Sequence, residues 1–142
     1  MINDITLADI EYVAFKLAQE KLLYDEPIPD FNTRFPNILE SCLANPFQSY
    51  AGKSLYPNLI SKAAILFYLL IKNHPFKNGN KRIAMTSLFL FLYNNNKWLE
   101  VNNMQLYNFT IWIAESLSMF KKETIMAIGT FLGKYIVDLK TR

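Results

Sequence analysis

Apolar residues recur at helical spacing along most of this chain. Near its start, Thr6 followed by Asp9 has the pattern of a capping box, in which two residues cap the first turn of a helix. This pattern predicts a first helix that ends near Leu23. Two prolines between residues 25 and 30 then interrupt it. The apolar positions of this helix are Ile10, Val13, Ala14 and Leu17.

The same spacing predicts further helices, which together indicate an all-α fold. The segment from 80 to 93 is apolar nearly all round, as expected for a central helix surrounded by others. We therefore expect a helical bundle with this segment at its centre. The predicted helices run from Pro36 to Ala44, from Pro57 until Asn73 and Pro75 interrupt the pattern, from Asn80 to Tyr93, from about Met104 to Glu115 and from Lys122 to Val137.

Residues 47 to 56 do not follow the helical pattern. They mix polar and apolar positions, with Gly52 near the middle and aromatic residues at both ends. This composition is typical of a short β-hairpin or an ordered flap. The predicted flap comprises Phe47, Gln48, Ser49, Tyr50, Ala51, Gly52, Lys53, Ser54, Leu55 and Tyr56.

Length and composition favour a single domain over residues 1–142, because single cores commonly hold about 100 to 200 residues. Hydrophobic residues make up 51% of the chain and aromatic residues 15%, which is enough to fill a sizeable core. The net charge of +3 arises from basic and acidic residues spread along the whole chain. Without a basic cluster, a nucleic-acid partner is not expected.

Cys42 is the only cysteine, so no intramolecular disulfide can form and no Cys/His cluster offers a zinc site. The N-terminus lacks the basic start and apolar run of a secretion signal. The uncharged stretch from Ile83 to Asn96 is shorter than the roughly 20 apolar residues that cross a bilayer. We therefore expect a cytoplasmic protein with no membrane partner.

The segment from His74 to Arg82 concentrates the candidate chemistry. It holds the only histidine, and Gly79 stands directly before a predicted helix. Backbone N–H groups at a helix start converge on an anion, helped by about half a positive charge from the helix dipole. Lys81 and Arg82 add full charges there, and the imidazole of His74 can accept a proton from an attacking hydroxyl. The combination indicates transfer of a phosphate-containing group.

The same residues could also have purely structural roles. A lone histidine is more often structural than catalytic, and two cations at a helix start can be solvated surface charges. Cations there oppose the helix dipole by roughly a few tenths of a kcal/mol unless an anion is present, which favours a ligand.

The pattern His-x-Phe-x-x-Gly-Asn-Lys-Arg resembles the signature of the Fic superfamily. Lys81, where AMP-transferring members have a second glycine, points to the death-on-curing (Doc) branch. The similarity covers roughly residues 37 to 103. It implies a Fic-type helical bundle with a short hairpin flap before the central motif. Most Fic proteins transfer AMP to a protein hydroxyl, whereas the Doc branch is known for phosphorylating a threonine of elongation factor Tu, so Lys81 favours phosphoryl transfer.

The resemblance also implies a role for each residue of the motif. His74 would be the catalytic base on a Ser, Thr or Tyr hydroxyl of a target protein, and Phe76 would anchor the loop in the core. The flap from 47 to 56 would hold the target segment by strand-like backbone pairing. The phosphates of a nucleoside triphosphate, with ATP the first choice, would be bound by Gly79, Asn80, Lys81 and Arg82.

Two residues depart from the pattern of the superfamily. Asn78 stands where the family usually has the Asp or Glu that binds Mg²⁺, and an amide oxygen is a weaker ligand than a carboxylate. Met85 replaces the second arginine of AMP-transferring members. The alternatives to a phosphotransferase are therefore an AMP-transferring enzyme and a catalytically degenerate, Fic-like protein-binding module.

Regulation is expected to come from a second protein. Many Fic proteins carry an inhibitory helix with Ser or Thr four residues before a Glu that is followed by Gly or Asn. None of the glutamates of this chain has that context. The resemblance therefore implies an antitoxin in trans, whose disordered tail folds onto the toxin.

Overall fold

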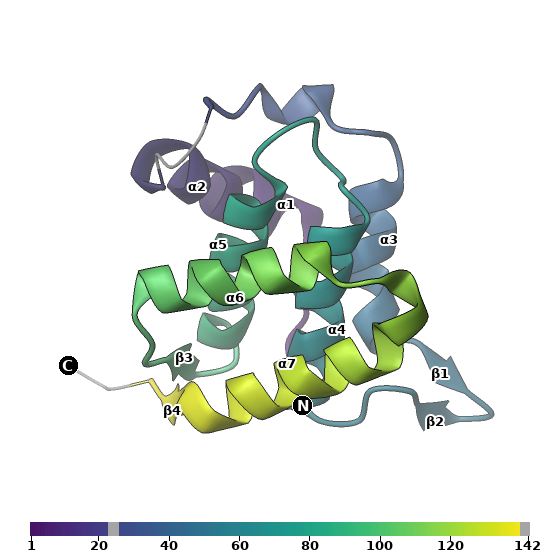
Figure 1. The fold of residues 1–142 in the computed structure, drawn as a ribbon. Helices are drawn as coiled ribbons and strands as arrows, with labels where there is room; N and C mark the ends of the chain where they lie inside the picture. The colour runs from purple at the N-terminus through teal and green to yellow at the C-terminus, as the bar shows by residue number, and fades with distance from the viewer. Residues whose placement is uncertain (23–25, 140–142) are drawn as a thin grey trace.

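The computed structural model describes residues 1–22 and 26–139, and Figure 1 shows an assembly of helices with two small two-stranded sheets. The predicted all-α class with a short hairpin is confirmed. The chain begins with α1 (Leu7–Asp9), a π-helical segment (Ile10–Ala14) and α2 (Phe15–Lys21), which follow one another without a break.

The predicted capping box is present at the start of α1. Thr6 Oγ1 accepts the N–H of Asp9, and the Asp9 carboxylate accepts the N–H of Thr6. The predicted end of this first helix, near Leu23, lies outside the described residues.

The next helix is shorter than predicted. α3 spans Ile38–Ala44 and not Pro36–Ala44, because Asn37 has a φ of 68° in the left-handed region, which no α-helix contains. The predicted hairpin follows, with β1 (Ser49–Tyr50) antiparallel to β2 (Lys53–Ser54). Its two turn residues, 51 and 52, both have positive φ, which is the geometry of a tight type I′ hairpin turn.

The two helices α4 (Leu59–Lys72) and α5 (Asn80–Tyr93) form the centre of the fold. α4 begins two residues after Pro57, because Asn58 and Ser61 cap its first turn reciprocally. Every residue of α4 from 62 to 71 is buried, and α4 packs most extensively on α5 and α7. α5 has the predicted bounds. This pair of helices carries the motif loop between them (Figure 1).

The last two helices, α6 (Asn103–Glu115) and α7 (Lys121–Tyr135), cover the central pair (Figure 1). α7 ends before the predicted Val137, because β4 (Ile136–Asp138) pairs antiparallel with β3 (Lys97–Leu99). Among the described residues, no helix is both long and apolar enough to pass through a lipid bilayer.

Candidate functional site

His74 lies just beyond the end of α4 in a left-handed backbone conformation that few residues other than glycine adopt. Asn73 closes the helix, and His74 then takes a φ of 48° in the left-handed region. Helices often end with a glycine in this conformation, because an L side chain there is strained by roughly 1–2 kcal/mol. His74 is nevertheless exposed to solvent. Strained backbone at an exposed polar residue is typical of functional sites.

Phe76 attaches the loop to the hydrophobic core. Its side chain is 3% exposed, and its ring lies 5.6 Å from the ring of Phe15 and 5.8 Å from that of Phe31, between centroids. Asn80 closes the loop, because its Oδ1 accepts the Phe76 N–H at 2.9 Å and its Nδ2 donates to the Phe76 carbonyl at 2.8 Å. The packing of Phe76 and the hydrogen bonds of Asn80 thus fix the conformation of the loop between α4 and α5.

Gly79 caps the N-terminus of α5 with a φ of 78°. The first hydrogen bond of the helix runs from the N–H of Ile83 to the Gly79 carbonyl. The three N–H groups before it, of Asn80, Lys81 and Arg82, make no hydrogen bond within the described part of the chain. Free amides of this kind, together with the positive end of the helix dipole, bind anions at other helix starts.

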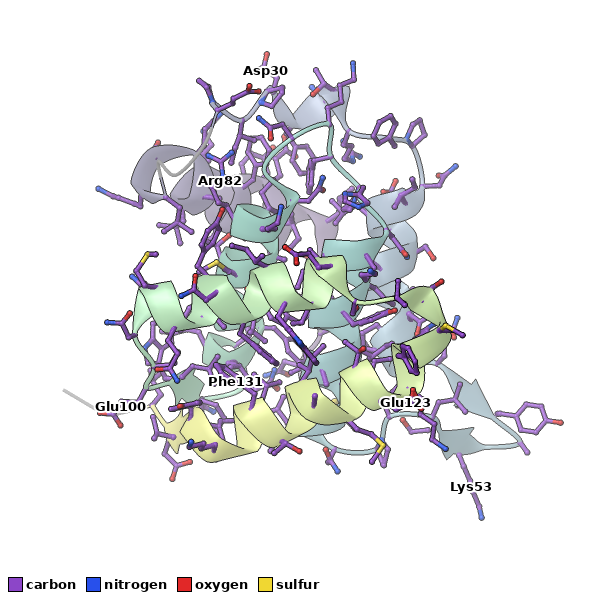
Figure 2. All side chains as sticks on the ribbon, in the orientation of Figure 1. Asp30, Lys53, Arg82, Glu100, Glu123 and Phe131 are labelled. Atoms are coloured by element: carbon purple, nitrogen blue, oxygen red, sulfur yellow. The ribbon has the colours of Figure 1, made fainter. Side chains whose placement is uncertain are left out.

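The two cations of the motif differ in their surroundings. Lys81 is partly exposed beside the free amides. Arg82 is 3% exposed, and its guanidinium donates to the Leu22 carbonyl at 3.2 Å and the Glu26 carbonyl at 2.7 Å. Arg82 therefore brings its backbone N–H to the helix start while its side chain crosses to the segment after α2, where Figure 2 labels it.

The segment Glu26–Ile28, which was not among the predicted site residues, lies against this loop. We call Glu26–Ile28 the strap, because its three carbonyls accept hydrogen bonds from the side chains of three different elements. Arg82 of α5 binds the first carbonyl at 2.7 Å, Asn78 of the loop binds that of Pro27 at 3.2 Å, and Gln19 of α2 binds the third at 3.0 Å. The only sequence signal for it is an isoleucine between two prolines, which predicts an extended segment with one buried side chain.

The hairpin is formed as predicted, but it lies at the opposite end of α4 from His74 (Figure 1). α4 has 14 residues, so its two ends are about 21 Å apart. Figure 2 shows Lys53 of β2 well separated from Arg82. The structure therefore does not bring the flap of residues 47–56 and His74 together, and the docking of a target strand along this flap stays a prediction.

The hairpin is instead tied to the buried start of α4. Lys62, which is 6% exposed, donates from Nζ to the Pro46 carbonyl at 3.0 Å and to Ser54 Oγ at 3.2 Å. Its Nζ also lies 4.8 Å from the centre of the Phe47 ring, a cation–π distance.

The residues around the loop do not fit the Mg²⁺ ion that the family implies. Both ends of the Asn78 amide are used within the protein, since Oδ1 accepts the Gly79 N–H at 2.8 Å and Nδ2 donates to Pro27. Across residues 1–22 and 26–139, no three His, Cys, Asp or Glu side chains gather in a group that could hold a metal ion.

A separate apolar cavity of about 440 Å³ lies between α2 and α5. Met85, which replaces an arginine of the AMP-transferring members, lines this cavity and is 1% exposed. His74 does not line it. Among the described residues, the cavity walls also include Leu17, Phe89, Trp98 and one charged residue, Lys21.

Comparison with known proteins places the chain in a family. The profile described as the Fic/DOC family matches residues 3–92. A relative named Toxin Doc, from Mycolicibacterium smegmatis, is 35% identical over 66 residues, and the match covers 46% of this chain and 51% of the relative. The chain therefore spans about half the length of this curated relative. No solved structure gave a significant match. Because the profile covers more than half of the chain, motif loop included, the chain belongs to the Fic/DOC family.

Proposed function

We propose that this chain is a Doc-like toxin that transfers a phosphoryl group from a nucleoside triphosphate, with ATP the first choice, to a hydroxyl of a target protein. The proposal rests on the geometry of the loop between α4 and α5. A single loop presents the exposed, left-handed His74 at one end and the free N-terminal amides of α5 at the other. The loop thus offers a proton acceptor and an anion-binding position on one rigid frame.

The proposed step uses these groups as follows. The free N–H groups of residues 80–82 and the ammonium of Lys81 bind the phosphate oxygens, and they stabilise the charge that builds up during transfer. An imidazole nitrogen of His74 accepts the proton of the target hydroxyl as its oxygen attacks the γ-phosphorus. The bond from this phosphorus to the bridging oxygen breaks, and the nucleoside diphosphate leaves with that oxygen.

Arg82 has a narrower part in this proposal than the sequence predicts. Its guanidinium already donates to two backbone carbonyls, so only its backbone N–H contributes to the phosphate position. Lys81 then supplies the full charge that reaches the nucleotide. Position 78 supplies no metal ligand.

The direct test is transfer of label to protein. The purified chain and cell lysate are incubated with ATP labelled at either the γ- or the α-phosphate. We expect label from the γ position alone, and a loss of roughly 100- to 10,000-fold in rate for His74→Ala. Label from the α position would instead support AMP transfer. No label from either would support the protein-binding module, which the absence of a carboxylate at position 78 favours.

The relative named Toxin Doc supports the proposal that the chain acts as a toxin. We place it in the cytoplasm, where nucleoside triphosphates are available, with an antitoxin in trans as its inhibitor. Strong expression without an antitoxin should stop growth, and expression of His74→Ala at the same level should not. Unaffected growth in both cultures would contradict the toxin assignment.

A further inference from the structure

Asn78 connects two parts of the site through the two ends of one side-chain amide. Its Oδ1 accepts the Gly79 N–H at 2.8 Å, and its Nδ2 donates to the Pro27 carbonyl of the strap at 3.2 Å. An ionised carboxylate accepts hydrogen bonds but donates none. The arrangement therefore requires an amide at the position where the family usually has an acid.

The strap and the glycine that it touches are packed closely enough for this bond to matter. Ile28 is 5% exposed, and a Cβ added to Gly79 would lie 2.6 Å from its Cγ1. The Pro27 carbonyl precedes this residue directly. Any shift of the strap thus changes the contact on Gly79, the residue whose left-handed conformation sets the direction of the first amides of α5.

We propose that Asn78 is a positioning residue that latches the strap onto the phosphate-binding loop, in place of a metal ligand. The latch keeps Gly79 in its left-handed conformation and the N–H groups of residues 80–82 directed at one point. Its effect on catalysis rests on the proposed function, whereas the latch itself is a property of the fold. An Asp at this position would keep the Gly79 bond, lose the donor to Pro27 and place a negative oxygen against that carbonyl.

Two variants of Asn78 separate the contributions of its two hydrogen bonds, and a third variant is the control. Asn78→Asp removes only the donor, Asn78→Ala removes both bonds, and Asn108→Asp makes the same chemical change at an exposed residue of α6. The readouts are the NMR order parameters of the Glu26 and Ile28 amides and the hydrogen-exchange rate of the Gly79 amide. Neither readout requires catalytic activity.

We expect the strap order parameters of Asn78→Asp to fall from about 0.85 to below about 0.6, with Gly79 exchange unchanged within about twofold. In Asn78→Ala, Gly79 exchange should also rise by roughly 3- to 10-fold, the factor expected for loss of one hydrogen bond. Asn108→Asp should leave both quantities at the wild-type values.

The outcomes also separate this proposal from the proposed function. An ordered strap in Asn78→Asp would overturn the latch, whatever the activity of the variant. The latch would also be overturned if MgCl₂ raised the rate of label transfer by Asn78→Asp above that of the wild type. Such a result would show that the acid at position 78 binds the metal and that Asn78 marks the loss of this ligand. If neither the wild-type chain nor any variant transfers label but the strap loosens in Asn78→Asp, the proposed function is wrong and the latch is supported.

Discussion

Gly79 lies directly against the side chain of Ile28, and a Cβ added to the glycine would come within 2.6 Å of Ile28 Cγ1. Two requirements therefore meet at one residue. The φ of 78° favours glycine, and the packing leaves no room for a methyl group. The glycine of the motif thus serves both the turn into α5 and the close approach of the strap.

Gly79→Ala should destabilise the protein by more than the same change at Gly52. Both glycines have a φ of 78°, but a Cβ at Gly52 meets nothing within 4 Å. Gly52→Ala should therefore lower the free energy of unfolding by up to about 1.5 kcal/mol, because left-handed strain of about 1–2 kcal/mol is partly offset by the reduced freedom of the unfolded chain. Gly79→Ala should lose roughly a further 1–3 kcal/mol from overpacking. Urea unfolding of the two variants measures the difference, and equal losses would show that Ile28 moves aside freely.

Substitution of Arg82 should mainly lower the stability of the protein, whereas substitution of Lys81 should mainly weaken nucleotide binding. Arg82→Met leaves the Leu22 and Glu26 carbonyls without their donor, so we expect a loss of about 1.5–3 kcal/mol in the free energy of unfolding. Lys81→Met should change stability by less than about 0.5 kcal/mol and weaken ATP binding. Chemical denaturation and calorimetric ATP titration measure the two quantities. An Arg82→Met variant of wild-type stability would contradict the assignment of its side chain.

His74→Gly should abolish label transfer without destabilising the protein. Glycine relieves left-handed strain of roughly 1–2 kcal/mol, of which about 0.5–1 kcal/mol is offset by the greater freedom of glycine in the unfolded chain. The free energy of unfolding should therefore stay constant or rise by up to about 1 kcal/mol. Asn96→Gly, with a φ of 61° outside the loop, is the matched control. A clear loss of stability in His74→Gly alone would show that the imidazole makes a structural contact.

Cys42 should make stability fall at alkaline pH. Burial raises the pKa of its thiol from 9.0 to about 11, against smaller lowering effects of the Asn73 side chain and its own backbone. The folded state therefore holds the thiol proton more tightly than the unfolded chain does. Stability is retained below about pH 9 and declines as the pH rises from 9 toward 11. Thermal melts across this range should show a weaker pH slope for Cys42→Ala, and identical slopes would exclude a contribution from this thiol.

Local signals explain the parts of the fold that the sequence predicts correctly. The capping box of Thr6 and Asp9 lies within one turn of helix, and the bounds of α5 follow from Gly79 before it and the asparagines after it. The hairpin likewise has its turn signal at Gly52. Each of these features is decided by residues close together in sequence.

The features of the structure that sequence patterns predicted wrongly or missed depend on contacts between residues far apart in the sequence. Val137 continues a helical pattern, but its backbone pairs with Trp98 in a sheet. The distance between the hairpin and His74 is set by the length of α4, and the docking role of the hairpin stays a prediction. The direction of the Arg82 side chain is set by carbonyls that lie 56 and 60 positions earlier in the chain, which no local pattern reveals.

The proposed chemistry requires that the loop between α4 and α5 bind the phosphates of a nucleotide. Titration of ATP into the ¹⁵N-labelled protein, followed by NMR, shows where the nucleotide binds. We predict that the largest shifts occur at the free amides of Asn80, Lys81 and Arg82, with the hairpin amides unchanged and the shifts lost or reduced in Lys81→Met. Shifts confined to residues of the apolar cavity between α2 and α5, or no shifts at saturating ATP, would show that this loop does not bind the nucleotide.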